Sequence, residues 1–315
     1  MTKATYVAPT RPDRRWRDLK RMWPLYLIIV PCVAHVILFI WAPLWGWLIA
    51  FYDYFPGKPI LDQRFVGMKY FERMLKDRYF LQALRNTLCL SFLALCAFPI
   101  APMFAVFLNE LRSNKVKRTI QTLSSFPNFI SWILVFSVFS ALFSVDDGAF
   151  NQIFFKELGW LKAPSNVLAD ARIARVLNAV ILPIWKGTGW SAIIYMAAIS
   201  GIDPTLYEAA EIDGAGRMRR IWHITVPGIM PTFTTLFILA MAGILNSGFE
   251  QYYIFTNSLT FSVLDNLDTY VYRVGMNNLN FSYGTALGMV RSIVSLLLLF
   301  LANQASYWIR GYRIY

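Results

Sequence analysis

The sequence predicts an all-helical membrane protein with six transmembrane spans. Of its 315 residues, 57% are hydrophobic and only 15% are charged, which is too apolar for a soluble domain of this size. Several apolar runs have the length of about 20 residues that an α-helix needs to cross a bilayer. Prolines inside these runs can be accommodated by neighbouring helices. The expected spans are 25–50, 87–108, 126–143, 176–199, 230–245 and 284–307.

Six spans place both termini on one side of the membrane, and the basic residues select that side. Seven of the first 24 residues are Lys or Arg, and more basic residues gather at 112–118 and 217–220. The positive-inside rule therefore predicts cytoplasmic N and C termini. The apolar run after the basic tail is long and lacks a small-residue cleavage site, so we expect a retained span and not a signal peptide. We divide the chain into a cytoplasmic tail, 1–24, and a transmembrane domain, 25–315.

The sequence does not indicate nucleic-acid binding, nucleotide binding, catalysis or metal binding. The formal net charge of +12 follows from membrane topology and does not require a nucleic-acid partner. The sequence has no glycine-rich phosphate-binding loop ending in Lys-Ser or Lys-Thr, so we expect no nucleotide site in this chain. The three cysteines lie within the expected spans, and neither they nor His35 and His223 form a metal-ligating pattern. We therefore expect no catalytic centre, no metal site and no cofactor in this chain.

A polar segment at about 200–228 separates the fourth and fifth spans. Asp203 and Pro204 combine an N-cap acceptor with a residue that suits the first helical turn, so a short helix is predicted to begin there. Its small residues Ala209 and Ala210 share one face, on which another backbone or a groove can approach closely.

The second half of this segment predicts a turn and another short helix. Gly214 suits the left-handed residue at a helix end, and Gly216 with Arg217 restarts the chain. From spacing alone, two interpretations remain for this helix–turn–helix: a docking element, or an ordinary cytoplasmic loop.

The segment resembles the EAA loop of permease subunits of bacterial ABC importers, in the form typical of sugar transporters. The resemblance continues back into the fourth span, where 185–190 reads Trp-Lys-Gly-Thr-Gly-Trp. It implies a type I, MetI-like permease architecture, in which this loop forms a coupling helix that docks into a cleft on a separate ATPase subunit. The residues that it assigns to ATPase coupling are Glu208, Ala209, Ala210, Asp213, Gly214, Ile224 and Pro227.

The resemblance also implies an assembly in the bacterial cytoplasmic (inner) membrane. The expected partners are a second, homologous permease, two ATPase subunits that bind ATP and Mg, and a periplasmic or lipid-anchored solute-binding protein. Transport would proceed by alternating access, driven by closure of the ATPase pair.

A second resemblance concerns the substrate. Residues 265–275 are similar to an outer loop of polysaccharide-type permeases, and the whole chain is similar to the first permease subunit of alginate importers. This implies an oligosaccharide or polysaccharide substrate, anionic if alginate-like. Importers of neutral oligosaccharides share the same motifs, so the sugar, its chain length and the permease that binds it stay open.

Polar residues inside the expected spans indicate a hydrated pathway for the solute. A charged side chain deep in a bilayer needs a partner or a wet cavity, and Lys186 and Arg291 are both deep. Asn246 and Glu250 are expected on one face at the outer end of the fifth span. The other interpretation is small-residue helix packing, with Lys186 or Arg291 paired with Glu250 or with backbone carbonyls. The candidate pathway residues are Lys186, Asn246, Glu250, Gly288, Arg291, Ser292 and Ser295.

Two alternatives come from other classes of protein. One is a membrane-embedded enzyme acting on a lipid-linked saccharide, with Lys186 and Arg291 binding phosphate and Glu250 as the base. The other is an ion-coupled carrier, which would usually show more spans and an internal repeat. Neither accounts for the EAA loop.

Overall fold

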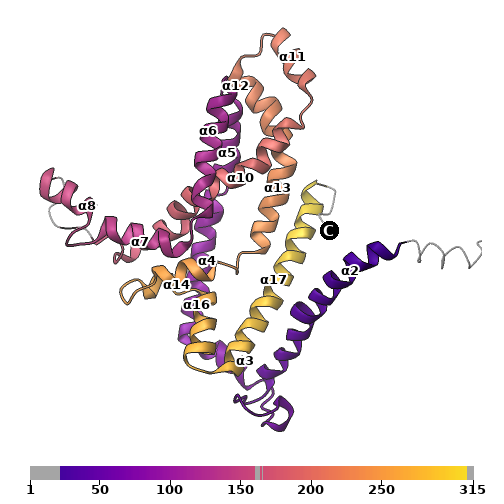
Figure 1. The fold of residues 1–315 in the computed structure, drawn as a ribbon, viewed down its shortest axis with the longest axis vertical. Helices are drawn as coiled ribbons and strands as arrows, with labels where there is room; N and C mark the ends of the chain where they lie inside the picture. The colour runs from indigo at the N-terminus through magenta and orange to yellow at the C-terminus, as the bar shows by residue number, and fades with distance from the viewer. Residues whose placement is uncertain (1–21, 160–163, 165, 311–315) are drawn as a thin grey trace, which may run out of the picture.

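The computed structural model describes residues 22–310, apart from 160–163 and 165. Regular structure in this part of the chain is helical, and its extended pairing is limited to one isolated bridge between Tyr52 and Phe65. The molecule is elongated, with helix α11 at one end and α3 at the other (Figure 1). The tail 1–24 lies almost wholly outside the described residues, so the domain division stays a prediction.

The first span is one continuous helical segment whose apolar side chains are mostly exposed. Helix α2, a π-helical turn and a 3-10 stretch run from Trp23 to Phe51. None of the residues of α2 is buried, and the helix lies apart from the bundle in Figure 1. Only its far end, at Ala50, joins the protein core. The segments are α2 (Trp23–Val36), η1 (Ile37–Trp41) and η2 (Ala42–Phe51).

The second span begins earlier than the expected residue 87. The Asp77 side chain caps α4 by accepting the N–H groups of Tyr79 and Phe80. The first turns of α4 bury Asn86, which donates to the carbonyls of Ser262 and Asp265. Because these turns pack against protein, they carry polar residues that a search for apolar runs leaves out. The segments are α3 (Lys69–Lys76), α4 (Arg78–Ala97) and α5 (Ile100–Asn109).

The expected span 126–143 is not one continuous helix. The helix begins at Asn114, and a bend of 97° separates the segment Asn114–Phe129 from Trp132–Phe143. Ile130 and Ser131 are extended at the bend, and the Ser131 hydroxyl accepts the N–H of Leu134 to start the second helix. The segments are α6 (Asn114–Ser125), η4 (Phe126–Phe129), α7 (Trp132–Phe143), α8 (Ala149–Asn151) and η5 (Gln152–Glu157).

The fifth span also ends before its expected boundary. Its helix stops at Ala242, and the chain turns at Gly243 before α14 begins at Phe249. Asn246 therefore lies in the break and Glu250 in the next helix, so the prediction that they share one face of a single helix is wrong. The segments are α9 (Ala171–Val176), η6 (Leu177–Ile181), α10 (Leu182–Ser200), α11 (Pro204–Ile212), α12 (Arg217–Arg220), η7 (Ile221–Thr225), α13 (Val226–Ala242) and α14 (Phe249–Phe255).

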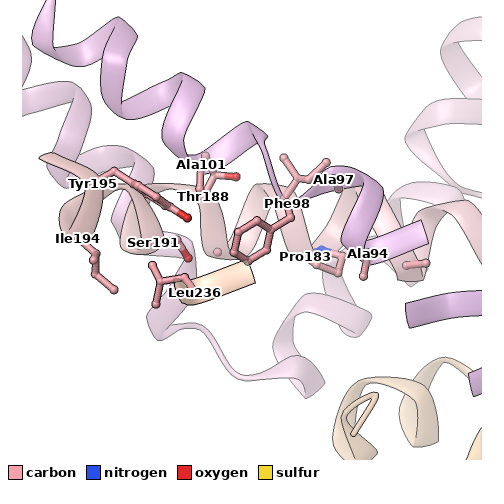
Figure 2. A pocket seen from close by; sticks show the side chains of 13 residues that line it. Ala94, Ala97, Phe98, Ala101, Pro183, Thr188, Ser191, Ile194, Tyr195 and Leu236 are labelled. Atoms are coloured by element: carbon pink, nitrogen blue, oxygen red, sulfur yellow. The ribbon is translucent and has the colours of Figure 1, made fainter. Parts of the chain in front are cut away.

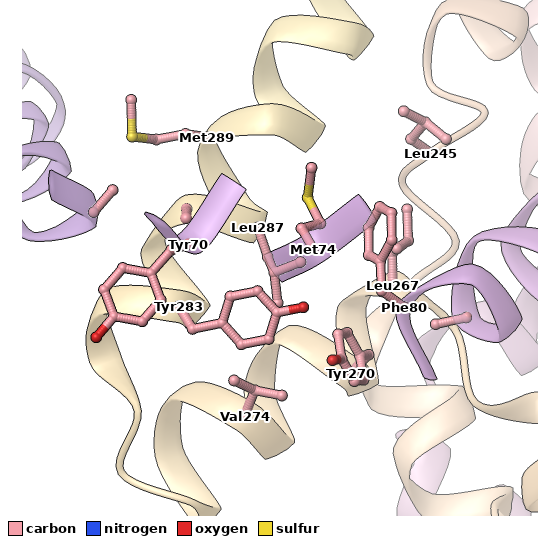
Figure 3. Close-up of a cluster of buried hydrophobic side chains, with 13 residues drawn as sticks. Tyr70, Met74, Phe80, Leu245, Leu267, Tyr270, Val274, Tyr283, Leu287 and Met289 are labelled. Carbon is pink, nitrogen blue, oxygen red and sulfur yellow. The ribbon is translucent and has the colours of Figure 1, made fainter. Parts of the chain in front are cut away.

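A long last helix, α17, packs against segments from several parts of the chain. Helix α17 contacts η2, α13, η8 and α3. Figure 3 shows the core at this end, where Tyr70 and Met74 of α3 lie beside Tyr283 and Leu287 of α17. The segments are α15 (Phe261–Leu264), α16 (Leu267–Tyr272), η8 (Arg273–Asn277) and α17 (Phe281–Arg310).

Within the described residues, four helices are long and apolar enough to cross a membrane, or five if the bent pair forms one span. They are Trp23–Phe51, Arg78–Asn109, Arg217–Ala242 and Phe281–Gln304. Helix α10, in the place of the expected fourth span, is not among them; it contains Lys186 and Gly187. The count of six spans and the side of the termini stay predictions.

Candidate functional site

The polar loop between α10 and α13 forms a helix–turn–helix, as its sequence predicts. The Asp203 carboxylate accepts the N–H of Thr205 at 3.0 Å and caps α11. Gly214 has φ +72°, the left-handed conformation that a side chain would strain. Gly216 then precedes the second short helix, α12.

Helix α11 projects from the end of the molecule with none of its residues buried (Figure 1). Its apolar residue Ile212 is 87% exposed, and Leu206 is also exposed. Glu208 and Ala209 are exposed, whereas Ala210 is half-buried. Helix α11 therefore offers most of its surface, including these two apolar side chains, to solvent or to a partner.

Polar contacts tie this loop to the helices beneath it. The Arg217 guanidinium donates to the carboxylate and to the backbone carbonyl of Glu110, at the end of α5. The hydroxyls of Tyr207 and Thr225 are 2.9 Å apart, which joins α11 to η7. Neither contact was predicted from the sequence, because Glu110 follows the expected span 87–108, Arg217 lies within the polar loop 200–228, and no pattern links the two.

The remaining coupling candidates lie on the chain that leads back into the membrane. Asp213 is exposed at the end of α11. Ile224 is half-buried in the π-helical turn η7, and Pro227 is in the first turn of α13. The structure thus spreads the seven candidates from the exposed tip of the loop to the base of α13.

Lys186 binds backbone carbonyls at the bend between α6 and α7. Its Nζ donates to the carbonyl oxygens of Pro127 at 3.2 Å and Asn128 at 2.9 Å, and to that of Ile130. It also lies 5.3 Å from the ring centre of Trp132. The chain is extended at Ile130 and Ser131, and the ammonium group gives the carbonyl oxygens at this bend a charged hydrogen-bond donor from another helix.

Arg291 joins the last helix to α16 and to the break after α13. It donates to the carboxylate of Asp268 on α16 and to the side-chain oxygen of Asn246 in the break after α13. The structure therefore brings together two candidates, Asn246 and Arg291, that are 45 residues apart. It places the third, Glu250, on an exposed part of α14.

The small residues of α17 differ in their surroundings. A Cβ built on Gly284 would lie 2.9 Å from the Cα of Gly275, so close helix packing requires glycine there. Gly288 has open space around its Cα. Ser292 is half-buried, and the Ser295 hydroxyl is buried without a hydrogen-bond partner among the described residues. Close helix packing thus accounts for Gly284, whereas Gly288 borders open space.

A cavity of about 290 Å³ lies between α4, α5, α10 and α13 (Figure 2). Three hydroxyl groups of α10, those of Thr188, Ser191 and Tyr195, line it. Tyr195 is 2% exposed, and its hydroxyl has no partner among the described residues. These residues were not among the predicted pathway residues. Their separations of three and four residues along the chain are nevertheless the sequence signal that places them on one face of the helix.

The fold and loop can now be compared with known proteins. Residues 97–310 match the family model described as the binding-protein-dependent transport system inner membrane component. This match spans the bent helix, the exposed loop and the last helix. The chain belongs to this family of transport permeases. It is a multi-pass membrane protein and a transport subunit.

Two relatives from Bacillus subtilis match most of the permease. Protein LplB is 43% identical over 90% of this chain and 89% of its own length. The polygalacturonan/rhamnogalacturonan transport system permease protein YteP is 42% identical over 89% of this chain and 86% of its own length.

Solved structures agree with the fold of the permease. A chain of a bacterial ABC transporter involved in import of the acidic polysaccharide alginate has a TM-score of 0.84 at 31% identity, covering 94% of this chain and 99% of that one. A chain of the alginate transporter in complex with an alginate pentasaccharide-bound periplasmic protein has a TM-score of 0.85, also at 31% identity, covering 96% and 100%. The resemblance to polysaccharide-type ABC permeases is confirmed, and the membrane-enzyme alternative gains no support.

Proposed function

We propose that this permease forms one half of the transmembrane pathway of an ATP-driven importer in the bacterial inner membrane. A second, homologous permease would supply the other half, and two ATPase subunits would bind ATP and Mg at the cytoplasmic end. A solute-binding protein would deliver the substrate from the opposite end. The exposed, capped and anchored helix α11 carries this proposal, because it presents a docking surface while its base is tied to α5 and η7.

The proposed substrate is an acidic oligosaccharide or polysaccharide. The names of YteP and of the alginate transporter both specify acidic polysaccharides. The hydroxyl-lined cavity beside α10 would offer hydrogen-bonding groups to sugar hydroxyls or to water that accompanies them. Gly288, Ser292 and Ser295 would border the same hydrated route, while Lys186 and Arg291 hold the helices around it.

The mechanism we propose is alternating access coupled through α11. Closure of the ATPase pair would move Glu208–Gly214, and the anchors at Glu110 and Thr225 would pass that movement to α5 and α13. Hydrolysis of ATP in the partner would reset the permease to face inward.

Glu208→Lys and Gly214→Pro test this proposal. The first change reverses a charge on the exposed docking helix, and the second forces φ near −65° where the chain needs +72°. We expect uptake by the reconstituted complex to fall at least about tenfold while both variants still insert into the membrane.

Glu72→Lys is the matched control, since it makes the same charge reversal on an exposed residue at the other end of the molecule. It should leave ATPase binding unchanged. Wild-type uptake by Glu208→Lys and Gly214→Pro, or purification of the wild-type chain from its native membrane without any ATPase, would refute the proposal.

A further inference from the structure

A second cavity lies at the end of the molecule opposite to α11. It has a volume of about 510 Å³, within the range of sites that bind small molecules. The start of α4, the segment α16–η8 and the start of α17 surround it. In Figure 3 the hydroxyls of Tyr270 and Tyr283, which both line this cavity, lie near each other.

The carboxylates around this cavity are already engaged. Asp77 accepts the hydroxyls of Tyr270 at 2.6 Å and Tyr283 at 2.9 Å, in addition to two backbone N–H groups. Burial raises the pKa of Asp77, but these hydrogen bonds outweigh burial and hold the pKa below its usual value. Asp265, which is buried just behind the cavity, binds both terminal nitrogens of Arg273, at 2.6 and 2.8 Å. Each carboxylate oxygen thus has a partner within the protein.

The groups left free for a ligand are donors and aromatic rings. The Arg73 guanidinium forms no salt bridge with any described residue and lies 5.0 Å from the ring centre of Tyr283. Asn278 is exposed and lines the cavity. Asn280, another lining residue, accepts the N–H of Tyr283 with its side-chain oxygen, so its amide N–H₂ is not used in that contact. Tyr79 is exposed at the mouth. Such a lining suits a ligand with a carboxylate, several acceptor oxygens and a ring face.

This cavity is separate from the contact that Arg291 makes. Asp268 binds Arg291 on one side of α16. Tyr270 follows by two residues, which is roughly 200° around the helix, so it lies on the opposite side. A ligand beside Tyr270 would therefore bind outside the contact between Arg291 and Asp268.

We propose that this cavity is a binding subsite for a hexuronate unit, with Arg73 binding the carboxylate and the two asparagine amides binding hydroxyl oxygens. This inference rests on the proposed function, because it names a class of sugar for the same transporter. The subsite would hold one part of an acidic chain at the outer surface while another part enters the membrane pathway.

Equilibrium binding of a fluorescent oligogalacturonate tests the subsite directly. The assay uses the purified permease complex without the solute-binding protein, so that binding by the latter does not contribute. We expect Arg73→Gln to weaken binding about tenfold or more, the loss of one hydrogen bond to a charged group. Asn278→Ala should weaken it less. A neutral oligogalactoside of equal length should bind no better to the wild type than to Arg73→Gln.

Lys76→Gln is the matched control, because it removes one exposed positive charge from the same helix at a residue that does not line the cavity. It should bind as the wild type does. Equal binding by Arg73→Gln and wild type, or no binding by the wild-type complex, would overturn the subsite. Uptake measured separately distinguishes the two ideas: a wild-type complex that binds the acidic sugar but imports none contradicts the proposed function and leaves the subsite standing.

Discussion

Gly187 and Gly189 are only two residues apart in the sequence, but one is next to open space and the other is tightly packed. A Cβ on Gly189 would lie 2.2 Å from the backbone of Ser124, where α6 crosses α10. The Gln121 side chain donates to the carbonyl of Gly189 at 2.8 Å across the same crossing. Gly187 lines the hydroxyl-bearing cavity and has nothing within 4 Å of its Cβ position. Of these two glycines, only Gly189 is required for helix packing.

Gly189→Ala should therefore destabilise the protein, whereas Gly187→Ala should not. The added methyl group at 189 forces α6 and α10 apart, and overpacking of this kind costs about 1–3 kcal/mol. The thermal unfolding midpoint of the detergent-solubilised protein measures the difference. Both substitutions raise helix propensity equally, so Gly187→Ala controls for that effect. Equal midpoints for the two variants would show that the crossing is not tight.

At the scale of elements, the bend between α6 and α7 depends on a side chain from another helix. The apolar run 126–143 hides the bend, although Pro127, Asn128 and Ser131 were available as signals. Lys186 meets the carbonyls exposed there, 56 to 59 residues away in sequence. Pairing with backbone carbonyls is one of the two interpretations that the sequence leaves open for Lys186, and this contact supports it.

The pair Glu110 and Arg217 joins two elements in a way that a charge exchange can test. Both side chains are partly exposed, so the pair should contribute about 1 kcal/mol or less to stability. Its expected role is to connect α12 to α5, and Glu110→Arg should lower uptake severalfold with little change in unfolding temperature. The double variant Glu110→Arg, Arg217→Glu should recover much of the uptake, measured in the reconstituted complex. A double variant no better than the single one would argue against a direct connection.

At the scale of the whole molecule, the two ends should face opposite sides of the membrane. Ile212 at the tip of α11 is 87% exposed, and Leu61 in the loop before α3 is 74% exposed. With Cys32, Cys89 and Cys96 replaced, Leu61→Cys should react with a membrane-impermeant maleimide in cells whose outer barrier is open. Ile212→Cys should react only after lysis of the cytoplasmic membrane. The reverse pattern would contradict the topology predicted from basic residues.

The sequence by itself determined the all-helical membrane class, the capped helix–turn–helix loop and the permease family. These features depend on local properties: an apolar run is contiguous, and Asp203 caps a helix that starts at the next residue. The loop also folds largely within itself, so its motif and its structure coincide.

Only the tertiary structure decided the bend in the third helical segment, the partners of Lys186 and Arg291, and the two cavities. Asp77 and Tyr283, for example, meet across 206 residues, and no periodicity links them. Hydropathy also misplaced the starts and ends of spans where helices pack on protein, as at Asn86. Several faces of a membrane helix are apolar, and each of them can contact lipid equally well. The contacts between helices therefore depend on small residues and polar pairs that meet only when the bundle is assembled.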